Sequence, residues 1–115
     1  MKVRIGISAR HVHLKESDFK KLFPNQELTK YMDLTQPGMF AANEKVSIFT
    51  EHARFDNVRI VGPLRNYTQV EISKTDSYKL KLNPPVRSSG DLDNSENIYI
   101  EANGNVILAT SSCII

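Results

Sequence analysis

Two histidines, His11 and His13, stand two residues apart near the start of the chain, in the run Ser8-Ala9-Arg10-His11-Val12-His13. Residues two apart point to the same side of an extended strand, so we expect both imidazoles on one face. Imidazole nitrogen is a common ligand of Zn²⁺, and two rings at this spacing can chelate one ion. Because a zinc site needs at least three protein ligands, the pair alone is equally compatible with a polar strand end.

The chain offers three kinds of third ligand: His52, Cys113 or a carboxylate. His52 falls in a predicted turn, where a histidine is typical of solvated surface. Cys113 lies in an apolar run and is typical of a small buried hydrophobe. Glu71 lies on the polar face of a predicted strand that otherwise carries core residues. Glu71 is therefore the best candidate from this set, with a plain surface glutamate as the alternative.

Two arginines could bind an anion beside such a metal. Arg65 follows Gly62-Pro63, and Arg87 lies in the loop over residues 84–91. The guanidinium group is a planar fork of donors that matches phosphate geometry. The alternative for each arginine is an exposed loop charge, and neither position is specific by itself.

The elements that must position these side chains are mainly strands. Alternating apolar and polar residues indicate a strand over residues 2–8 that leads into the histidines. Asn103-Gly104 is a strong hairpin signal, and Pro37-Gly38 marks a turn. The pattern predicts a small, mostly antiparallel β-barrel or sandwich with short helices near 15–23 and 75–81, the second capped by Thr75 or Asp76. The other strands are expected over residues 26–32, 44–50, 54–61, 67–73, 96–102 and 105–110, with one more beginning at 113.

Composition narrows the class of protein further. The 115 residues suit one domain, and 40% hydrophobic with 24% charged residues is ordinary for a soluble protein. A net charge of +2 without basic clusters argues against nucleic acid as a partner. The chain has no long apolar run, so we expect no membrane span. A single cysteine and the absence of a signal-like start favour a cytoplasmic location.

Five segments together resemble the phosphate propanoyltransferases of propanediol-utilisation type, a family of zinc-dependent phosphotransacylases. The segments follow the family in order and spacing over nearly the whole chain, and they cover residues 8–13, 33–44, 58–65, 69–73 and 84–92. The resemblance implies the reversible conversion of acyl-CoA and phosphate into acyl phosphate and coenzyme A. It also implies a fold of two β-barrels capped by short helices, with two zinc ions between them.

The resemblance assigns a role to each candidate residue. It implies that His11, His13 and Glu71 bind one zinc and that Arg65 holds the attacking phosphate. Gln36, in the Pro37-Gly38 turn, and Arg87 would contact coenzyme A. Residues 11–115 would form a single barrel, whereas residues 1–10 would hold a strand that pairs with the second barrel of the family.

In the family, a second histidine pair and a later histidine follow the position equivalent to Ile115, and they bind the second zinc. The 115-residue sequence stops before them, so we expect the N-terminal part of such an enzyme, inactive alone. Three alternatives stay open. A second chain or a homo-oligomer could complete the enzyme, the barrel could be a non-catalytic module that binds zinc, phosphate or coenzyme A, or it could be purely structural.

Overall fold

The computed structural model describes residues 10–115, in which strands dominate and two short helices interrupt them. The strand predicted over residues 2–8 lies outside the described residues. In chain order the elements are β1 (His11–His13), α1 (Glu16–Leu22), β2 (Lys30–Asp33), β3 (Phe40–Phe49), β4 (Arg54–Gly62), β5 (Gln69–Glu71), α2 (Lys74–Leu80), β6 (Glu96–Ala102) and β7 (Asn105–Ile114).

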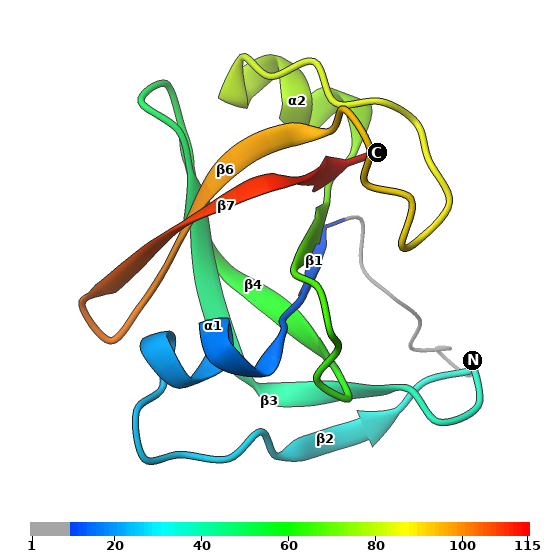
Figure 1. Cartoon of the computed structure of the whole chain (residues 1–115), viewed down its shortest axis with the longest axis vertical. Coiled ribbons are helices and arrows are strands. Elements are labelled where there is room, and N and C mark those ends of the chain that lie inside the picture. The colour runs from blue at the N-terminus through cyan, green and yellow to red at the C-terminus, as the bar shows by residue number, and fades with distance from the viewer. Residues whose placement is uncertain (1–9) are drawn as a thin grey trace, which may run out of the picture.

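Six of these strands close into a barrel (Figure 1). They follow the order β3-β4-β1-β5-β7-β6, and β6 pairs back to β3 to close the ring. The β1–β4 and β5–β7 pairs are parallel, and the other pairs are antiparallel. The predicted fold class, a small and mostly antiparallel barrel with short helices, is therefore confirmed. β2 extends the sheet beyond the barrel, because among the described strands it pairs with β3 alone.

β3 is the strand that joins the barrel to this extension. Its first part pairs with β2 and its last three residues, 47–49, pair with β6, while β4 runs along its other edge. Two register shifts against β4, between Ala41 and Lys45 and between Val46 and Ile48, mark irregular pairing along it. Such irregularities bend a strand and increase its twist, which lets β3 pair with β2 at one end and with β6 at the other. The predicted strand over residues 44–50 lacks the first four residues of β3.

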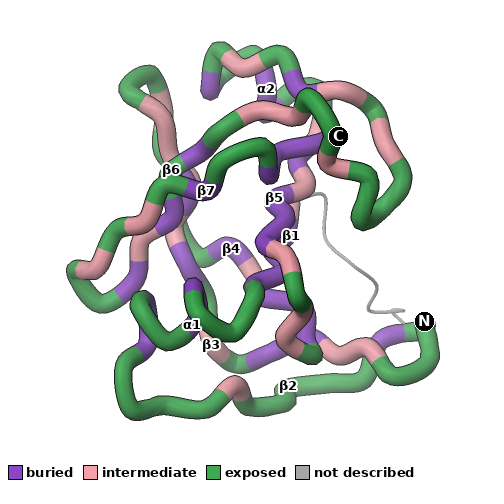
Figure 2. Tube along the Cα trace, in the orientation of Figure 1, coloured by how far each residue is buried: buried purple, intermediate pink, exposed green. Residues whose placement is uncertain are grey.

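The core fills the barrel interior from alternate strand positions. Val12, Ile60 and Val70 face one another across β4, β1 and β5, and each is fully buried. Figure 2 shows the buried segments gathered along the inner strands, with exposed loops outside them. Both helices contribute to the same core, α1 through Phe19 and Leu22 and α2 through Leu80. The helices thus anchor to the barrel through apolar side chains, which supply most of the stability of such short helices.

Local signals explain where the elements begin and end. Asn103 and Gly104 both adopt positive φ, as a two-residue hairpin turn requires. The predicted cap of α2 at Thr75 or Asp76 is wrong, because Ser73 is the cap. The Ser73 hydroxyl accepts from the Asp76 N–H at 3.0 Å, and the Asp76 carboxylate accepts from the Ser73 N–H at 3.4 Å. This reciprocal pair is a capping box, which satisfies two backbone donors at once.

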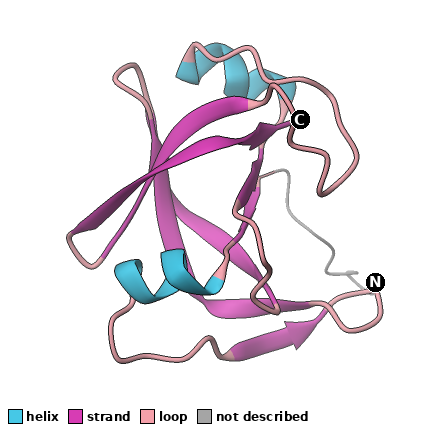
Figure 3. Cartoon of the chain, viewed as in Figure 1, coloured by secondary structure: helices cyan, strands magenta, loops and turns pink. Residues whose placement is uncertain are grey.

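The last strand also differs from the prediction. The sequence pattern predicts two strands, over residues 105–110 and from 113 onward, but β7 runs without interruption from Asn105 to Ile114. Ser111 adopts a φ of 46° within it, next to a shift in the β6–β7 register, so the strand bends and continues beside β5. A long loop between α2 and β6 crosses nearby (Figure 3). None of the helices in the described part of the chain is long and apolar enough to cross a membrane.

Candidate functional site

The site residues lie on the outer face of the barrel, on the neighbouring strands β1 and β5 and on the turn and loop beside them. β1 lies between β4 and β5, and its register places His11 opposite Glu71 and His13 opposite Gln69. Because Val12 points into the core, the pleat turns both histidines the other way. The sequence prediction that the two imidazoles share one face is confirmed.

These side chains are close together and shielded from solvent. His11 Nε2 lies 3.8 Å from Glu71 Oε1, and the His11 and His13 ring centroids are 5.0 Å apart with nearly perpendicular planes. Each histidine is only 2% exposed, whereas the Glu71 side chain is 35% exposed. Even so, no three His, Cys, Asp or Glu side chains within residues 10–115 converge closely enough to hold a metal ion in this arrangement.

His13 carries an unusual nitrogen. Its Nδ1 is buried and has no hydrogen-bond partner, the one such side-chain atom found within residues 10–115. Burial lowers the pKa of His13 to about 3, with help from the positive charge of Arg65 and from His11, while a hydrogen bond with the Val61 backbone opposes the shift. The imidazole is therefore neutral at physiological pH, which is the form that binds metals.

Arg65 is placed beside His13 by the turn that follows β4. Its backbone N–H donates to the Leu14 carbonyl at 2.9 Å. Its guanidinium donates to the Tyr67 hydroxyl and, at 3.1 Å, to Ser89 Oγ. Arg65 is half-buried, and its other terminal nitrogen lies 3.9 Å from Met39 Sδ. The structure thus brings the predicted phosphate-binding residue next to the predicted metal-binding histidines.

Sequence reasoning missed the role of Gln69, which holds the loop that carries Ser89 and Gly90. Gln69 is fully buried, and its Oε1 accepts from the Gly90 N–H at 2.7 Å while its Nε2 donates to Ser89 Oγ at 3.2 Å. Gly90 has a φ of +89°, a left-handed conformation that favours glycine. The Ser-Ser-Gly run over residues 88–90 was the available signal, but its contact with Gln69 joins segments twenty residues apart.

The remaining candidates, Arg87 and Gln36, make other contacts. Arg87 forms an ion pair with Asp91 at 3.1 Å, and its backbone N–H donates to the Ile115 carbonyl. Gln36 is exposed in the turn at Gly38, which adopts the expected positive φ. Neither takes part in the hydrogen bonds through which Arg65 is held, so their role at coenzyme A stays a prediction.

The two rival metal ligands are placed as the sequence indicated. His52 is exposed in the turn between β3 and β4, with its Nε2 3.4 Å from Glu51 Oε1. Cys113 is fully buried in the core, where burial, together with the charge of Glu96, raises the pKa of its thiol to about 12. A protonated thiol in the core is a packing residue, and Glu71 as the third ligand stays a prediction.

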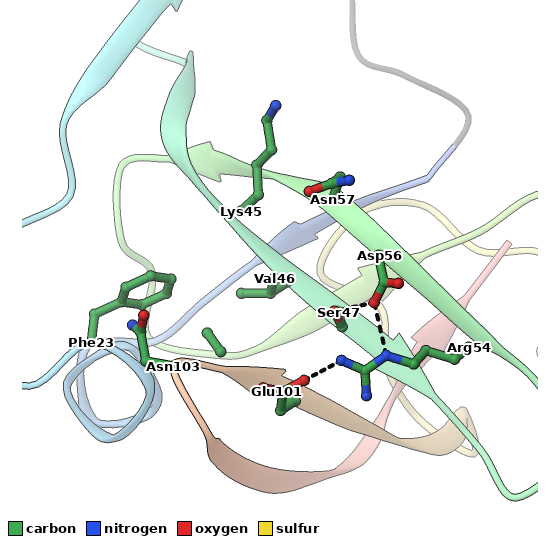
Figure 4. A pocket seen from close by; sticks show the side chains of 10 residues that line it. Phe23, Lys45, Val46, Ser47, Arg54, Asp56, Asn57, Glu101 and Asn103 are labelled. Carbon is green, nitrogen blue, oxygen red and sulfur yellow. Dashed lines mark hydrogen bonds and ion pairs between the residues drawn. The ribbon is translucent and has the colours of Figure 1, made fainter.

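A surface hollow of about 440 Å³ lies elsewhere on the barrel, between β3, β4 and the β6–β7 hairpin. Figure 4 shows Arg54 reaching across it to Asp56 and Glu101, with Lys45 and Asn57 pointing outward above. Arg54 Nε is 2.7 Å from Asp56 Oδ1, and its charge is also met by Glu101. Because its charges are matched and no predicted site residue lines it, this hollow is not the candidate site.

Fold and site together define a class of protein. It is a small mixed β-barrel whose outer face presents two buried imidazoles, a carboxylate and an arginine–serine pair. A neutral imidazole beside a guanidinium fork is suited to bind an anion, and the imidazole and carboxylate groups are ligand types for a divalent metal.

Comparison with known proteins identifies the family. The sequence profile described as Phosphate propanoyltransferase matches residues 4–115, nearly the entire chain. The chain therefore belongs to the phosphate propanoyltransferase family.

Several curated relatives carry the same name. The chain is 44% identical to Phosphate propanoyltransferase of Thermotoga maritima over 112 residues, which are 96% of this chain and 53% of the relative. It is 45% identical to that of Shewanella putrefaciens over 113 residues, covering 98% of this chain and 54% of the relative. With that of Priestia megaterium it shares 54% identity over 99 residues, 85% of this chain and 46% of the relative. The chain thus spans about half the length of these relatives.

Proposed function

We propose that this chain is one barrel of a phosphate acyltransferase, which converts acyl-CoA and phosphate into acyl phosphate and coenzyme A. The observation that carries the proposal is the position of Arg65. Its backbone N–H donates to the carbonyl of Leu14, the residue after His13, at 2.9 Å, and its guanidinium donates to Ser89 Oγ at 3.1 Å. A phosphate bound by Arg65 would lie beside His11 and His13. Membership of the family supports the same reaction.

Zinc is the metal that this donor set would take. His11, His13 and Glu71 supply two nitrogens and one carboxylate oxygen, a combination that Zn²⁺ accepts. The unpaired Nδ1 of His13 supports the fit, because a buried polar atom without a partner is costly unless a ligand satisfies it. Since the three groups do not converge in this arrangement, at least one side chain would shift to ligate the ion. When bound, zinc would neutralise phosphate charge and act as a Lewis acid.

The chain's own residues would bind and orient the phosphate. Arg65 can offer a bidentate donor pair to two phosphate oxygens, and Ser89 can turn its hydroxyl towards the same anion. In the proposed reaction a phosphate oxygen attacks the thioester carbonyl carbon, and the carbon–sulfur bond breaks to release coenzyme A as its thiolate. No cysteine nucleophile is needed, consistent with the place of Cys113 in the core. Gln36 and Arg87 are proposed contacts of coenzyme A.

Turnover is proposed to need more than this barrel. The relatives are about twice as long, and the resemblance assigns a second zinc to their other half. A homo-oligomer or a second chain that supplies the missing half would complete the enzyme. A cytoplasmic location is proposed from the sequence composition.

The experiment combines binding with turnover. The 115-residue chain is titrated with zinc and with inorganic phosphate, and acyl phosphate formation from propanoyl-CoA is measured with and without the C-terminal half of the Thermotoga maritima relative. We expect binding of both ligands by the chain alone, and turnover only when the second half is added. Turnover by the chain alone would show that the barrel is a complete enzyme. Failure to bind either ligand would overturn the proposed site.

A non-catalytic binding module is the second candidate function. It is supported by the ligand groups that this barrel holds by itself, the buried His13 Nδ1 and the Arg65–Ser89 pair. This module would bind zinc or phosphate as above, but adding the second half would produce no acyl phosphate.

A further inference from the structure

Thr68 links the first helix to the turn that carries Arg65. Its hydroxyl donates to Asp18 Oδ2 at 2.5 Å and accepts from the Lys15 N–H at 3.2 Å. Asp18 and Thr68 are both buried, at 9% and 6% exposure. Buried hydrogen bonds to a carboxylate are stronger than neutral ones and hold their geometry well. We call these three residues the Asp18–Thr68–Lys15 clamp.

The clamp acts next to a second tie between the same two segments. Arg65 donates its backbone N–H to the Leu14 carbonyl at 2.9 Å, and Lys15 and Arg65 form an isolated parallel bridge. Leu14 and Lys15 follow His13 directly in the chain. Leu14 is bonded to the first residue of the turn, Arg65, and Lys15 is bonded to its last residue, Thr68. The backbone bond holds the start of the turn at Arg65, and the clamp holds its end at Thr68.

The position of the turn decides where the guanidinium lies. Between the two ties stands Tyr67, whose hydroxyl accepts a hydrogen bond from the Arg65 guanidinium, and immediately after them comes Gln69, which holds Ser89. A shift of residue 68 would therefore move the partners of Arg65 on both sides. Binding sites are sensitive to such shifts, because a displacement near one ångström can weaken a productive contact severely.

We propose that Asp18 and Thr68 are positioning residues that hold the Arg65 guanidinium in register with His13. Neither touches the anion, since both act through the turn at residues 65–68. The inference rests on the proposed phosphate site at Arg65. It assigns to α1 a function in ligand binding in addition to its packing against the core.

The test measures two quantities in each variant: the affinity for phosphate and the mobility of the Arg65 side chain. The 115-residue chain is titrated with inorganic phosphate by calorimetry, and the Arg65 Nε–H signal is followed by ¹⁵N NMR. In Thr68→Val, which keeps the shape and removes the hydroxyl, we expect phosphate affinity to fall about fivefold to tenfold. We also expect the Arg65 signal to shift and become more mobile. Thr68→Ser, which restores the hydroxyl, should stay within about twofold of the parent chain.

Two further variants separate positioning from stability. Asp18→Leu with Thr68→Val replaces both side-chain partners by apolar groups. It avoids an unpaired buried carboxylate, although the Lys15 N–H loses its acceptor, and it should still weaken phosphate binding. Thr50→Val removes a similar bond, from Thr50 Oγ1 to the Leu80 carbonyl at 2.8 Å, and should leave phosphate affinity unchanged.

The outcomes distinguish this inference from the proposed function. Parent-like affinity and a parent-like Arg65 signal in Thr68→Val would overturn the inference, as would an equal loss of affinity in Thr68→Ser. If the parent chain binds no phosphate, the proposed function fails. The Arg65 signal then still decides whether the clamp orders that side chain.

Discussion

His11 and Glu71 face each other across the antiparallel β1–β5 pair, and His11 Nε2 lies 3.8 Å from Glu71 Oε1. The strand register, not the loops, thus creates the contact between imidazole and carboxylate. Positions built on paired strands are held more precisely than positions on loops. The arginine and serine that complete the cluster come instead from a turn and a loop that other side chains must fix.

Replacing a proposed zinc ligand should abolish metal uptake. We expect His11→Ala and Glu71→Gln each to weaken zinc affinity at least about 100-fold, because even outer partners of a metal site cost about 10–100-fold when removed. Zinc content after dialysis and competition with a coloured chelator measure the effect. His52→Ala, at an exposed turn histidine, is the matched control and should retain parent affinity. Equal zinc content in His11→Ala and the parent would show that this pair is not the metal site.

Arg65→Lys should keep the charge but lose the fork of donors. We expect affinity for inorganic phosphate to fall about tenfold, since lysine cannot replace a bidentate guanidinium. Calorimetric titration gives the dissociation constant, and circular dichroism checks the fold. Arg54→Lys, in the separate ion cluster with Asp56 and Glu101, is the control. Unchanged affinity in Arg65→Lys would remove Arg65 from the site.

The ion pair between Arg10 and Asp76 should make stability depend on pH. Two hydrogen bonds of 2.9 and 3.0 Å join the groups, and the arginine lowers the pKa of Asp76 below its usual 3.8. A carboxyl with a lower pKa in the folded state stabilises the protein above the unfolded pKa, and this stabilisation is lost as pH falls through the folded pKa.

Asp76→Asn should therefore reduce the free energy of unfolding by roughly 1 kcal/mol at pH 7, a modest value because the Arg10 side chain is 38% exposed. The difference from the parent should shrink as pH falls below about 3.8. Urea unfolding across this range, with a chelator present, measures it. Asp33→Asn, in the exposed pair with Lys30, should change stability little at any pH. A constant difference between parent and Asp76→Asn would contradict the assignment.

The strand that leads to Arg65 depends on a close contact at its end. Gly62 pairs with Phe40 across β3 and β4, and a Cβ at Gly62 would lie 2.3 Å from the Phe40 ring. We expect Gly62→Ala to cost about 1–3 kcal/mol of stability by overpacking. Adding Phe40→Leu should recover part of the loss, which a double-mutant cycle in urea would reveal. Additive effects of the two changes would show that the ring and the glycine do not interact.

Local patterns are enough to predict several of these features. His11 and His13 on one face, the Asn103-Gly104 hairpin and the buried Cys113 each follow from strand alternation, turn chemistry or an apolar neighbourhood. The zinc and phosphate roles come from the family resemblance and stay proposals. The fold class can also be predicted from local patterns, because a chain of many short strands without a βαβ pattern is compatible with few architectures, mainly barrels and sandwiches.

Features that depend on distant contacts are not predictable in this way. The bond from Gln69 to Gly90 and the parallel pairing of β5 with β7 join segments that no local pattern connects. The predicted strand in place of β3 is too short because the first residues of β3 pair with an extension outside the barrel. The predicted cap of α2 falls too late because Ser73, Thr75 and Asp76 are all good capping residues, and only the reciprocal bond selects among them.

The alternation on β1 has one more consequence. His11 and His13 point outward, whereas Val12 between them fills the core. A slip of β1 by one residue against its neighbours would exchange these faces and drive two imidazoles into the apolar interior. The slip would place both rings among apolar side chains and take Val12 out of the core, so the misaligned barrel would be disfavoured. The residues proposed for ligand binding therefore also favour the correct register of β1 when the chain folds.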